Sequence, residues 1–284
     1  VLVPVPRPVS NMKVVFDTFN ITLMPGVNTL YIALLAEPWF KANPPKSLRI
    51  CYSGAAPLLP QTAQDWFELT GAAIYEGYGL TESTCVVSSM PLGRPPKPGT
   101  CGRPVPGTEV RLVGPDGQDM PKGEAGELWV RGPQIMKGYL GQPDATAATV
   151  TEDGWLKTGD IARIDDEGYI SIVDRIKDMV IISGFNVYPT DIEAVLTRHP
   201  GVSDAAVVGV PSQETGEALV AYVTPARADE NLTAKELRAH VREHLTGYKV
   251  PKLYEIVDDL PKSPVGKVLR REVRDMARKK YSDL

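Results

Sequence analysis

The densest group of chemically useful residues in this chain lies in segment 173–189, Val-Asp-Arg-Ile-Lys-Asp-Met-Val-Ile-Ile-Ser-Gly-Phe-Asn-Val-Tyr-Pro. Two carboxylates and two cations stand within Asp174–Asp178, and an apolar strand, a glycine turn and a helix start follow them. An ordinary core segment does not need this combination. Because glycine adopts backbone angles that are closed to other residues, the turn at Gly184 lets another molecule approach the backbone closely. The segment predicts a charge cluster at a strand edge beside an approachable turn.

A tyrosine between two glycines marks a second segment, 76–82, with the sequence Glu-Gly-Tyr-Gly-Leu-Thr-Glu. The glycines let the backbone lie close to a flat ligand, and Tyr78 could stack on its ring. The hydroxyl of Thr81 and the carboxylate of Glu82 are hard oxygen ligands that suit Mg²⁺ and phosphate. The alternative interpretation is a glycine-rich connection that carries a surface glutamate.

Three separate residues could complete such a site. Asp160 follows a glycine at the head of an apolar strand, where it could bind two neighbouring hydroxyls, as on a ribose, or form a turn or helix cap. Arg175 has a fork of donors suited to a phosphate oxygen or a sugar hydroxyl, and its alternative is a surface pair with an aspartate. Lys267 follows a glycine just before a basic helix, and its ammonium suits a developing oxyanion or a phosphate. A plain surface role is the alternative for any single lysine.

A basic stretch, a pair of histidines and an acidic segment each have a structural interpretation as well as a chemical one. The stretch 261–280 has eight Lys or Arg against two acidic residues, a local net charge of +6, and is either a solvated helix face or a patch for phosphates. His240 and His244 have the spacing of metal ligands on a helix, but no third ligand is evident, so we expect a structural role. The acidic segment 165–167 precedes a glycine turn, and we expect it to be a solvated tip.

Composition limits the class of protein. The chain has 284 residues, 43% of them hydrophobic and 23% charged, which suits roughly two globular domains. A net charge of −4 gives no electrostatic case for binding nucleic acid. Three widely spaced cysteines indicate a reducing compartment without disulfides. The longest apolar run, 30–36, is far short of the roughly 18 residues of a membrane span, and we find no signal peptide. Because the first residue is Val, we expect the chain to be part of a longer protein.

The order of predicted elements indicates the α/β class. We expect a remnant of a large α/β domain, an α/β layer to about residue 92 and a β-rich subdomain over about 93–175, followed by a small α+β domain over 176–284. Predicted strands are 14–16, 48–52, 109–113, 127–131, 169–173, 205–210 and 218–223. Predicted helices in the first half of the chain are 28–36 and 61–69, the latter with a stop at Gly71. A capping box at Thr190–Glu193 predicts a helix that runs to about His199, and a second capping box at Thr233–Glu236 predicts a helix that runs to Leu245. A basic helix is predicted from Val268.

Five segments taken together resemble, in order, the motifs of the adenylate-forming superfamily, which includes acyl-CoA synthetases, luciferases and peptide-synthetase adenylation domains. They are the adenine-side glycine turn (53–57), the Y-G-x-T-E motif (78–82), the T-G-D motif (155–160), the hinge and its following turn (174–189), and the C-terminal P-K-x-x-x-G-K (261–267). The forms of 174–178, 183–189 and 245–251 look most like bacterial long-chain fatty acid–CoA ligases. The resemblance covers essentially the whole chain.

The resemblance implies an acid–thiol ligase that activates a long-chain fatty acid in two steps. The acid attacks the α-phosphate of ATP to give acyl-AMP and pyrophosphate, and the thiol of coenzyme A then attacks the mixed anhydride and releases AMP. The implied cofactors and substrates are ATP/AMP, Mg²⁺, coenzyme A and a fatty acid. The first 175 residues would be the C-terminal part of the AMP-binding domain, and the small domain would be a mobile lid.

The resemblance also implies roles for individual residues. The catalytic residues would be Lys267, Glu82 and Thr81, with Glu82 also binding Mg²⁺. The nucleotide-binding residues would be Gly54, Ala55, Glu76, Gly77, Tyr78, Gly79, Thr81, Asp160 and Arg175. Coenzyme A would lie along Ser183, Gly184 and Phe185. Lys177 would be the hinge at which the lid turns, withdrawing Lys267 after the first step and bringing Gly184 to the thiol channel.

One expected motif is missing. We find no Ser/Thr/Gly-rich phosphate loop ending in a lysine, so we expect these residues alone to be impaired in adenylation. Two alternatives stay open: an acyl-AMP ligase that delivers to a carrier protein, and a non-catalytic nucleotide-binding or interaction module. We expect a cytoplasmic protein with small-molecule partners and no nucleic acid. Peripheral contact with the inner membrane face and a homodimer are left open.

Overall fold

The computed structural model describes residues 1–284 except 7, 228–231, 264–265 and 282–284. It divides into two compact units. The first unit comprises Val1–Thr158 and Ala162–Ile172, and the second comprises Gly159–Ile161 and Val173–Leu284. The predicted boundary between residues 175 and 176 stays a prediction.

The first unit begins with a sheet of five strands in the order β1-β2-β3-β4-β5. The strands are β1 (Leu23–Gly26), β2 (Ile50–Ser53), β3 (Ala73–Tyr78), β4 (Ser88–Ser89) and β5 (Arg103–Pro104). The first three run parallel, and β4 and β5 continue the sheet antiparallel. Parallel strands need crossover connections, and helices supply them here. This arrangement confirms the predicted α/β class.

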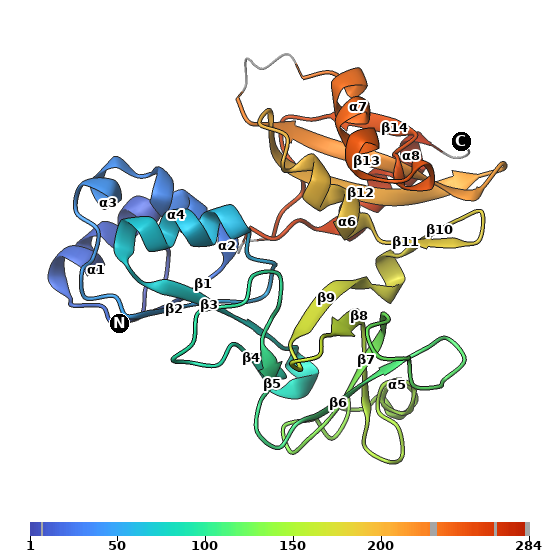
Figure 1. Ribbon diagram of the computed structural model, residues 1–284, viewed down its shortest axis with the longest axis horizontal. Helices are drawn as coiled ribbons and strands as arrows, with labels where there is room; N and C mark the ends of the chain where they lie inside the picture. The colour runs from blue at the N-terminus through green and yellow to red at the C-terminus, as the bar shows by residue number, and fades with distance from the viewer. Residues whose placement is uncertain (7, 228–231, 264–265, 282–284) are drawn as a thin grey trace. The chain divides into compact units, whose positions relative to one another are not determined.

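Helices gather along one face of β1, β2 and β3 (Figure 1). They are η1 (Val9–Met12), α1 (Lys13–Thr18), α2 (Asn28–Ala36), α3 (Pro38–Ala42) and α4 (Pro60–Thr70). Their core is aromatic, since the Trp66 ring lies 4.8 Å from Tyr31 and 5.2 Å from Phe40, measured between centroids. Helix α4 begins with Pro60 and ends at Gly71, whose φ of 74° closes the helix in the left-handed region, as predicted.

The predicted strand at 14–16 is wrong, because these residues lie in helix α1. Val14 is 65% exposed, so it does not form the buried strand that its β-branched neighbours suggested. Phe16 anchors the helix instead, with its ring 5.6 Å from the ring of Phe40. Tertiary packing of one aromatic side chain therefore overrides a weak local preference for strand.

A second sheet follows in the order β6-β7-β8-β9. Its strands are β6 (Glu109–Val113), β7 (Gly126–Arg131), β8 (Leu156–Ile164) and β9 (Ile170–Arg175), with η2 (Thr81–Ser83) and α5 (Pro143–Thr149) as the adjoining short helices. Its face is held by stacked cations and rings, since the Arg111 guanidinium lies 4.7 Å from the Trp129 ring and 4.5 Å from the Trp155 ring. Strands β8 and β9 contribute residues to both units.

The second unit is a sheet with helices on both faces. The strand order is β11-β10-β13-β12, and β14 pairs with β13 in parallel. The strands are β10 (Val180–Ile182), β11 (Phe185–Val187), β12 (Val202–Ser212), β13 (Gly216–Pro225) and β14 (Leu253–Ile256). The helices are η3 (Ile176–Asp178), α6 (Pro189–Leu196), α7 (Ala234–His244), η4 (Gly247–Lys249) and α8 (Arg270–Lys280).

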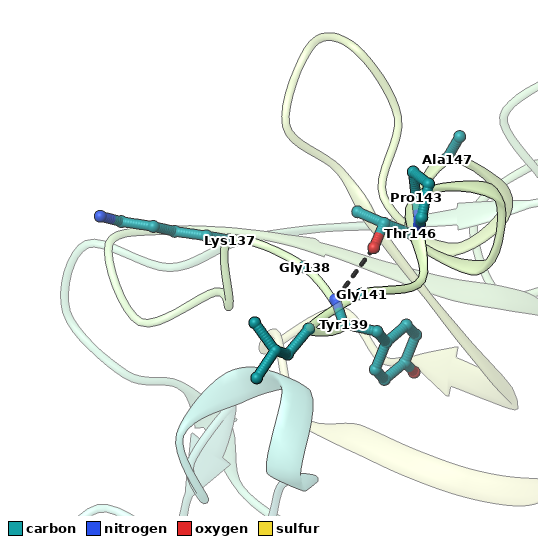
Figure 2. Close-up of a pocket in the computed structure, with 8 residues that line it drawn as sticks. Lys137, Gly138, Tyr139, Gly141, Pro143, Thr146 and Ala147 are labelled. Carbon is teal, nitrogen blue, oxygen red and sulfur yellow. Dashed lines mark hydrogen bonds between the residues drawn. The ribbon is translucent and has the colours of Figure 1, made fainter.

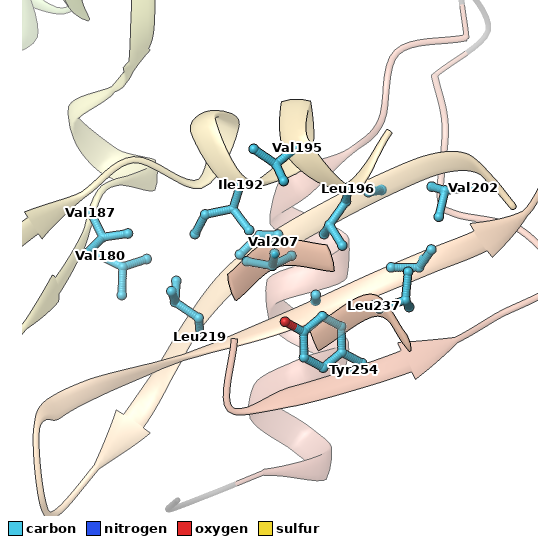
Figure 3. Packing of buried hydrophobic residues seen from close by; sticks show 14 of the residues in the cluster. Val180, Val187, Ile192, Val195, Leu196, Val202, Val207, Leu219, Leu237 and Tyr254 are labelled. Atoms are coloured by element: carbon cyan, nitrogen blue, oxygen red, sulfur yellow. The ribbon is translucent and has the colours of Figure 1, made fainter. Parts of the chain in front are cut away.

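Strand β13 is apolar on both faces, which explains this layering. Leu219 and Val223 belong to a core with residues of α6 and α7, whereas Val220 and Tyr222 belong to a core with Val273 of α8. Side chains alternate between faces along a strand, so a strand without polar alternation must be covered on both sides. Figure 3 shows the first of these cores, with Ile192, Val207, Leu219 and Tyr254 pointing toward one another.

One predicted capping box is confirmed and the other is wrong. At α7, Thr233 Oγ1 accepts from the amide of Glu236 at 3.3 Å, and the Glu236 carboxylate accepts from the amide of Thr233 at 3.0 Å. At α6 the helix begins at Pro189 without a side-chain cap. Proline already suits the first helical position. The Glu193 carboxylate is bound elsewhere, to Arg270 and to the amide of Val207.

Among the described residues, no helix has the length and the apolar character needed to cross a membrane.

Two buried tyrosines offer a matched test of the packing. The hydroxyl of Tyr31 donates to the carbonyl of Tyr52 at 2.7 Å, whereas the hydroxyl of Tyr254 is buried without a partner among the described residues. Tyr31→Phe leaves a buried carbonyl short of its donor, so we expect it to cost about 1–2 kcal/mol of unfolding free energy. Tyr254→Phe removes an unpaired hydroxyl and should leave stability unchanged or higher. Urea denaturation of both variants checks this, and a larger loss for Tyr254→Phe would contradict the assigned packing.

Candidate functional site

The parallel strands β1, β2 and β3 end at one edge of their sheet, where ligands bind in open α/β sheets. Gly26, Ser53 and Glu76 mark this edge, and Ser53 is paired in register with Glu76. The hydroxyl of Tyr31 lies 2.7 Å from the Tyr52 carbonyl and 3.1 Å from the Met24 carbonyl, so one side chain fixes the ends of two strands. The predicted residues Gly54, Ala55, Glu76 and Gly77 therefore lie together.

The backbone at this edge of the sheet leaves little space for larger side chains at its glycines. A Cβ on Gly79 would lie 1.9 Å from the carbonyl oxygen of Cys85, and a Cβ on Gly77 would lie 3.2 Å from the carbonyl oxygen of Ser88. Gly54 stands next to Gly77, with 3.7 Å between its would-be Cβ and the Gly77 carbonyl. Ala55 has a φ of 65°, a strained angle for a residue with a side chain. Close backbone approach therefore requires glycine at position 79, is tight at Gly77 and leaves ordinary contact distance at Gly54.

Glu76 is the one predicted residue at this edge with a strongly perturbed acidity. Its carboxylate accepts a hydrogen bond from the amide of Leu58 at 3.2 Å. Burial raises the pKa of Glu76 to about 7, and the Leu58 amide opposes that change only in part. The group therefore exchanges a proton near neutral pH, at the end of the strand that leads into the tyrosine and its two glycines.

Tyr78 is half-buried and packs against the core of the second sheet, beside Val87 and Leu128. One side of the ring is therefore already in contact with protein, and stacking on a base would use its remaining surface. Thr81 is exposed in the short helix η2. The prediction of a stacking role for Tyr78 stays a prediction.

Glu82 is positioned by a residue that sequence reasoning missed. Its Oε1 accepts a hydrogen bond from the hydroxyl of Tyr139 at 2.7 Å, and its carbonyl accepts from the amide of Met136 at 2.8 Å. The Glu82 carboxylate raises the pKa of Tyr139 in return. The only sequence signal was an aromatic residue after a glycine, fifty-seven residues from Glu82.

This arrangement fits a magnesium site of the kind that substrates help to complete. Mg²⁺ is usually held by one or two carboxylates together with substrate phosphates, and it keeps several waters. A carboxylate can accept several hydrogen bonds or bind metal through its other lone pairs, so the single bond to Tyr139 orients Glu82 without saturating it. Over the described residues there is no group of three His, Cys, Asp or Glu that could hold a metal without such help.

A shallow depression of about 500 Å³ lies beside Tyr139. Its walls come from the loop and helix start over 137–147, and the amide of Tyr139 donates to Thr146 Oγ1 at 2.9 Å (Figure 2). Leu140 lines it and is fully exposed. None of the predicted site residues lines this depression, and we assign no ligand to it.

The second unit brings together three other predicted residues. Arg175 Nε lies 3.0 Å from Asp160 Oδ1, and Asp160 is 3% exposed. Lys267 as a whole is exposed, but partial burial of its ammonium and the nearby charge of Arg175 lower its pKa, while Asp160 opposes them. The influence of both charges shows that Lys267 shares the surroundings of Asp160 and Arg175. A lysine whose pKa is lowered by burial and a nearby charge is a recurrent feature of functional sites.

The expected place of Asp160 at the head of a strand is wrong. Asp160 lies in the middle of β8, which starts at Leu156 and ends at Ile164. Gly159 just before it has a φ of 70°, so the strand is kinked there rather than begun. The kink explains why the apolar pattern seemed to start only after Gly159.

The hinge and turn residues lie on the surface of the same unit. Lys177 is exposed in η3. Ser183 and Gly184 have φ values of 49° and 85°, which is the combination of a two-residue type I′ hairpin turn between β10 and β11. A Cβ on Gly184 would meet nothing within 4 Å, so this turn is open to an approaching molecule. The next residue, Phe185, is 56% exposed.

The two histidines, the acidic segment 165–167 and the basic stretch 261–280 all contain side chains with hydrogen-bond or ion-pair partners. A ring nitrogen of His240 lies 2.9 Å from the Val195 carbonyl, and Nδ1 of His244 lies 2.9 Å from the His240 carbonyl. In the acidic tip, Asp165 pairs with Lys97 at 2.7 Å. In the basic stretch 261–280, Arg271 is exposed, whereas Arg270 and Arg274 turn inward to carboxylates. Within that stretch, Pro264 and Val265 lie outside the described residues.

The predicted residues thus form two groups. Gly54 through Glu82 belong to the first unit, and Asp160, Arg175, Lys177, Lys267 and the turn at Gly184 belong to the second. The convergence of Glu82 with Asp160 and Arg175 around one nucleotide stays a prediction, because the two groups belong to different units.

The raised pKa of Glu76 predicts a pH-dependent stability. Its pKa is about 7 in the folded chain against a usual 4.5, so its stabilising effect is complete below about pH 4.5 and is lost as the pH rises through 7. Glu76→Gln mimics the protonated form at all pH values. We expect the free energy of unfolding of the variant, relative to wild type, to rise by on the order of 3 kcal/mol between pH 4.5 and pH 8. Denaturation at both pH values measures this, and a pH-independent difference would contradict it.

Two family models match the chain. The model described as AMP-binding enzyme matches residues 1–140, and the model described as AMP-binding enzyme C-terminal domain matches residues 191–267. Together they cover most of the chain.

Named relatives agree with these matches. The chain is 48% identical over 274 residues to a long-chain-fatty-acid–CoA ligase of Yersinia pestis, covering 96% of this chain and 48% of the relative. It is 43% identical over 256 residues to a feruloyl-CoA synthase of Amycolatopsis sp, covering 90% of this chain and 52% of the relative. The crystal structure of ATP-bound MatB from Rhodopseudomonas palustris is similar with a TM-score of 0.89 and 34% identity, covering 97% of this chain and 54% of that one.

The chain spans about half the length of the curated relatives that it matches. The two family models match residues in both units, and the AMP-binding model precedes the C-terminal model in the chain. The chain therefore belongs to the adenylate-forming AMP-binding enzymes.

Proposed function

We propose that the protein carrying this chain is a long-chain fatty acid–CoA ligase. In the first step a carboxylate oxygen of the acid bonds to the α-phosphorus of ATP, and the bond to pyrophosphate breaks. In the second step the sulfur of coenzyme A bonds to the acyl carbon, the bond to AMP breaks, and the thiol proton is released. The grouping of Lys267 with Asp160 and Arg175 supports this proposal most directly. The 48% identical relative of that name supports the substrate class.

Each residue in the second unit has a role that suits its geometry. Asp160, held by Arg175 at 3.0 Å, accepts hydrogen bonds from the ribose hydroxyls. Lys267 donates to the acid and the α-phosphate, where negative charge develops. Partial burial lowers the pKa of Lys267 most, and the positive charges of Arg175, Arg270 and Lys177 lower it further. Binding of an anion is favoured there because the anion neutralises this crowded positive charge.

The first unit supplies the nucleotide edge. The close-packed backbone at Gly54, Gly77 and Gly79 lets the base approach, with Tyr78 beside it. Thr81 contacts phosphate, and Glu82 would hold Mg²⁺ with Tyr139 fixing its orientation. Mg²⁺, when bound, neutralises phosphate charge. Residues Ser183, Gly184 and Phe185 form an open turn that suits the pantetheine arm of coenzyme A.

The proposal places the protein in the cytoplasm, in peripheral contact with the inner membrane face, because long-chain fatty acids partition into bilayers. It further places residues 1–175 in the AMP-binding domain and 176–284 in a lid that turns at Lys177. The proposed oligomeric state is a homodimer.

Replacement of Lys267 should separate the two half-reactions. In the protein of full family length, we expect Lys267→Ala to slow acyl-AMP formation by about 100-fold or more, because one charge-stabilising donor is lost. Thioester formation from supplied acyl-AMP should change only a few-fold. Pyrophosphate release and acyl-CoA formation measure the two steps separately.

Lys252→Ala is the matched control, since Lys252 also pairs with a carboxylate, Glu214 at 3.3 Å, and lies outside the loop 261–267. Equal loss of both half-reactions in Lys267→Ala would refute the assigned role.

The molecule that accepts the acyl group distinguishes a CoA ligase from an acyl-AMP ligase. We expect thioester formation with free coenzyme A after incubation with ATP, Mg²⁺ and a long-chain fatty acid, as followed by mass spectrometry. Thioester found only on a carrier protein would instead identify an acyl-AMP ligase. Nucleotide binding without any adenylate would identify a non-catalytic module, and either result would reject the ligase proposal.

A further inference from the structure

Asp174 is a buried carboxylate whose hydrogen-bond donors come from its own strand and from two distant segments. It lies at the end of β9 and is 4% exposed. It accepts from its neighbour, the amide of Arg175, at 2.8 Å, from the amide of Thr190 at 3.0 Å, and from Nη1 of Arg270 at 3.2 Å. A buried carboxylate is unfavourable without such donors. These contacts therefore fix where the segments of Thr190 and Arg270 lie.

Two of these contacts cross the proposed hinge. Lys177 follows Asp174 by three positions, whereas Thr190 and Arg270 both come after Lys177 in the chain. A rotation about Lys177 that carries α6 and α8 away from β9 must break the Thr190 and Arg270 contacts to Asp174. The contact to the Arg175 amide lies before the hinge and is unaffected.

The other carboxylate partners of Arg270 lie on its own side of the hinge. Its guanidinium reaches Asp178 at 3.3 Å and Glu193 at 2.5 Å, and Asp178 also pairs with Arg274. Burial works against the charged form of Arg270, but the charges of Glu193, Asp174 and Asp178 outweigh it and raise the pKa of the guanidinium. Two of these three carboxylates, Glu193 and Asp178, lie after the hinge. Arg270 therefore keeps compensating charges after Asp174 has released it, so release is feasible without stranding the cation.

Arg270 is also connected to Lys267. Lys267 precedes it by three residues, and the loop that carries Lys267 is closed on itself: the amide of Ser263 donates to the Lys267 carbonyl at 2.8 Å, and the amide of Leu269 donates to the Pro261 carbonyl at 2.8 Å. The loop is therefore tied to the start of α8. Because Asp174 lies before the hinge, its contact to Arg270 also limits the movement of Lys267 relative to Asp160 and Arg175, whereas the contacts of Arg270 to Asp178 and Glu193 move with the lid.

We propose that Asp174 is a latch that holds Lys267 in its place beside Asp160 and Arg175 through Arg270 and the Thr190 amide, and that its release governs the passage from adenylation to thioester formation. The inference rests on the proposed two-step function and adds a positioning residue to it. Asp174 contacts no reacting atom in this scheme. It acts through the equilibrium between the latched and the released arrangement.

The first test compares two isosteric variants of the full-length protein. Asp174→Asn removes the charge before the hinge, and Glu193→Gln removes a charge from the same Arg270 after the hinge. We expect Asp174→Asn to change the ratio of the two half-reaction rates about tenfold in favour of thioester formation, a usual size for a conformational coupling. Glu193→Gln should lower thermal stability without changing that ratio. Equal changes of the ratio, or none in Asp174→Asn, would overturn the latch.

Arg270→Lys provides a variant that keeps the charge. A single ammonium cannot reach Asp174 and Glu193 together as the planar guanidinium does. We expect Arg270→Lys to change the ratio of the two half-reaction rates in the same direction as Asp174→Asn. Arg270→Lys also replaces Asp174→Asn in the test if that variant does not fold. A ratio equal to wild type would count against the latch.

Hydrogen exchange on the chain tests the latch without any activity. In Asp174→Asn we expect faster exchange at the Thr190 amide and across 176–178. In Glu193→Gln we expect it at the Val207 amide, which donates to Glu193 at 2.8 Å, and not at the hinge. If no acyl-AMP forms with any protein, the proposed function fails, and the latch is then decided by this exchange pattern alone. Identical patterns in the two variants would refute it.

Discussion

Charge neutralisation of three carboxylates, the buried Asp174 and Asp178 and the half-buried Glu193, is the interaction on which the second unit depends. Two arginines of one helix, Arg270 and Arg274, provide it. Such clusters contribute little net stability, because desolvation of the charges offsets much of their attraction. What they provide is geometry, since each carboxylate must meet its arginine at hydrogen-bond distance. The cluster thereby fixes the end of β9, the start of α6 and the start of α8 against one another.

The position of Lys267 follows from that geometry. A lysine side chain is long and mobile, so its chemistry depends on where its loop is anchored. Here the loop is closed by backbone hydrogen bonds and leads directly into α8, which the three carboxylates hold. Helix α8 is also held by apolar packing on the sheet, because its Val273 is buried against Val220 and Tyr222 of β13. Packing and charge thus agree on one placement of the helix.

The first unit uses a different constraint, the close approach of backbones. At Gly79 the neighbouring chain leaves no room for a side chain, at Gly77 the space is tight, and Ala55 holds a left-handed angle. These positions cluster where three parallel strands end. Burial at the same edge shifts the acidity of Glu76 toward neutrality. This edge of the sheet is formed mainly by backbone, so it depends on the sequence through its glycines more than through charged side chains.

The sequence by itself determined the α/β class, most element positions and the identity of the motif residues, because apolar periodicity, glycines and prolines act locally. It missed the helix at 14–16 and the uncapped start of α6, since the first depends on the distant ring of Phe40 and the second on the capture of Glu193 by Arg270 and Val207. Only the tertiary structure decided that Tyr139 holds Glu82 and that Asp174 binds Arg270, ninety-six residues away. The physical reason is that a hydrogen bond between distant segments leaves no periodic trace in the sequence, whereas burial and local backbone angles do.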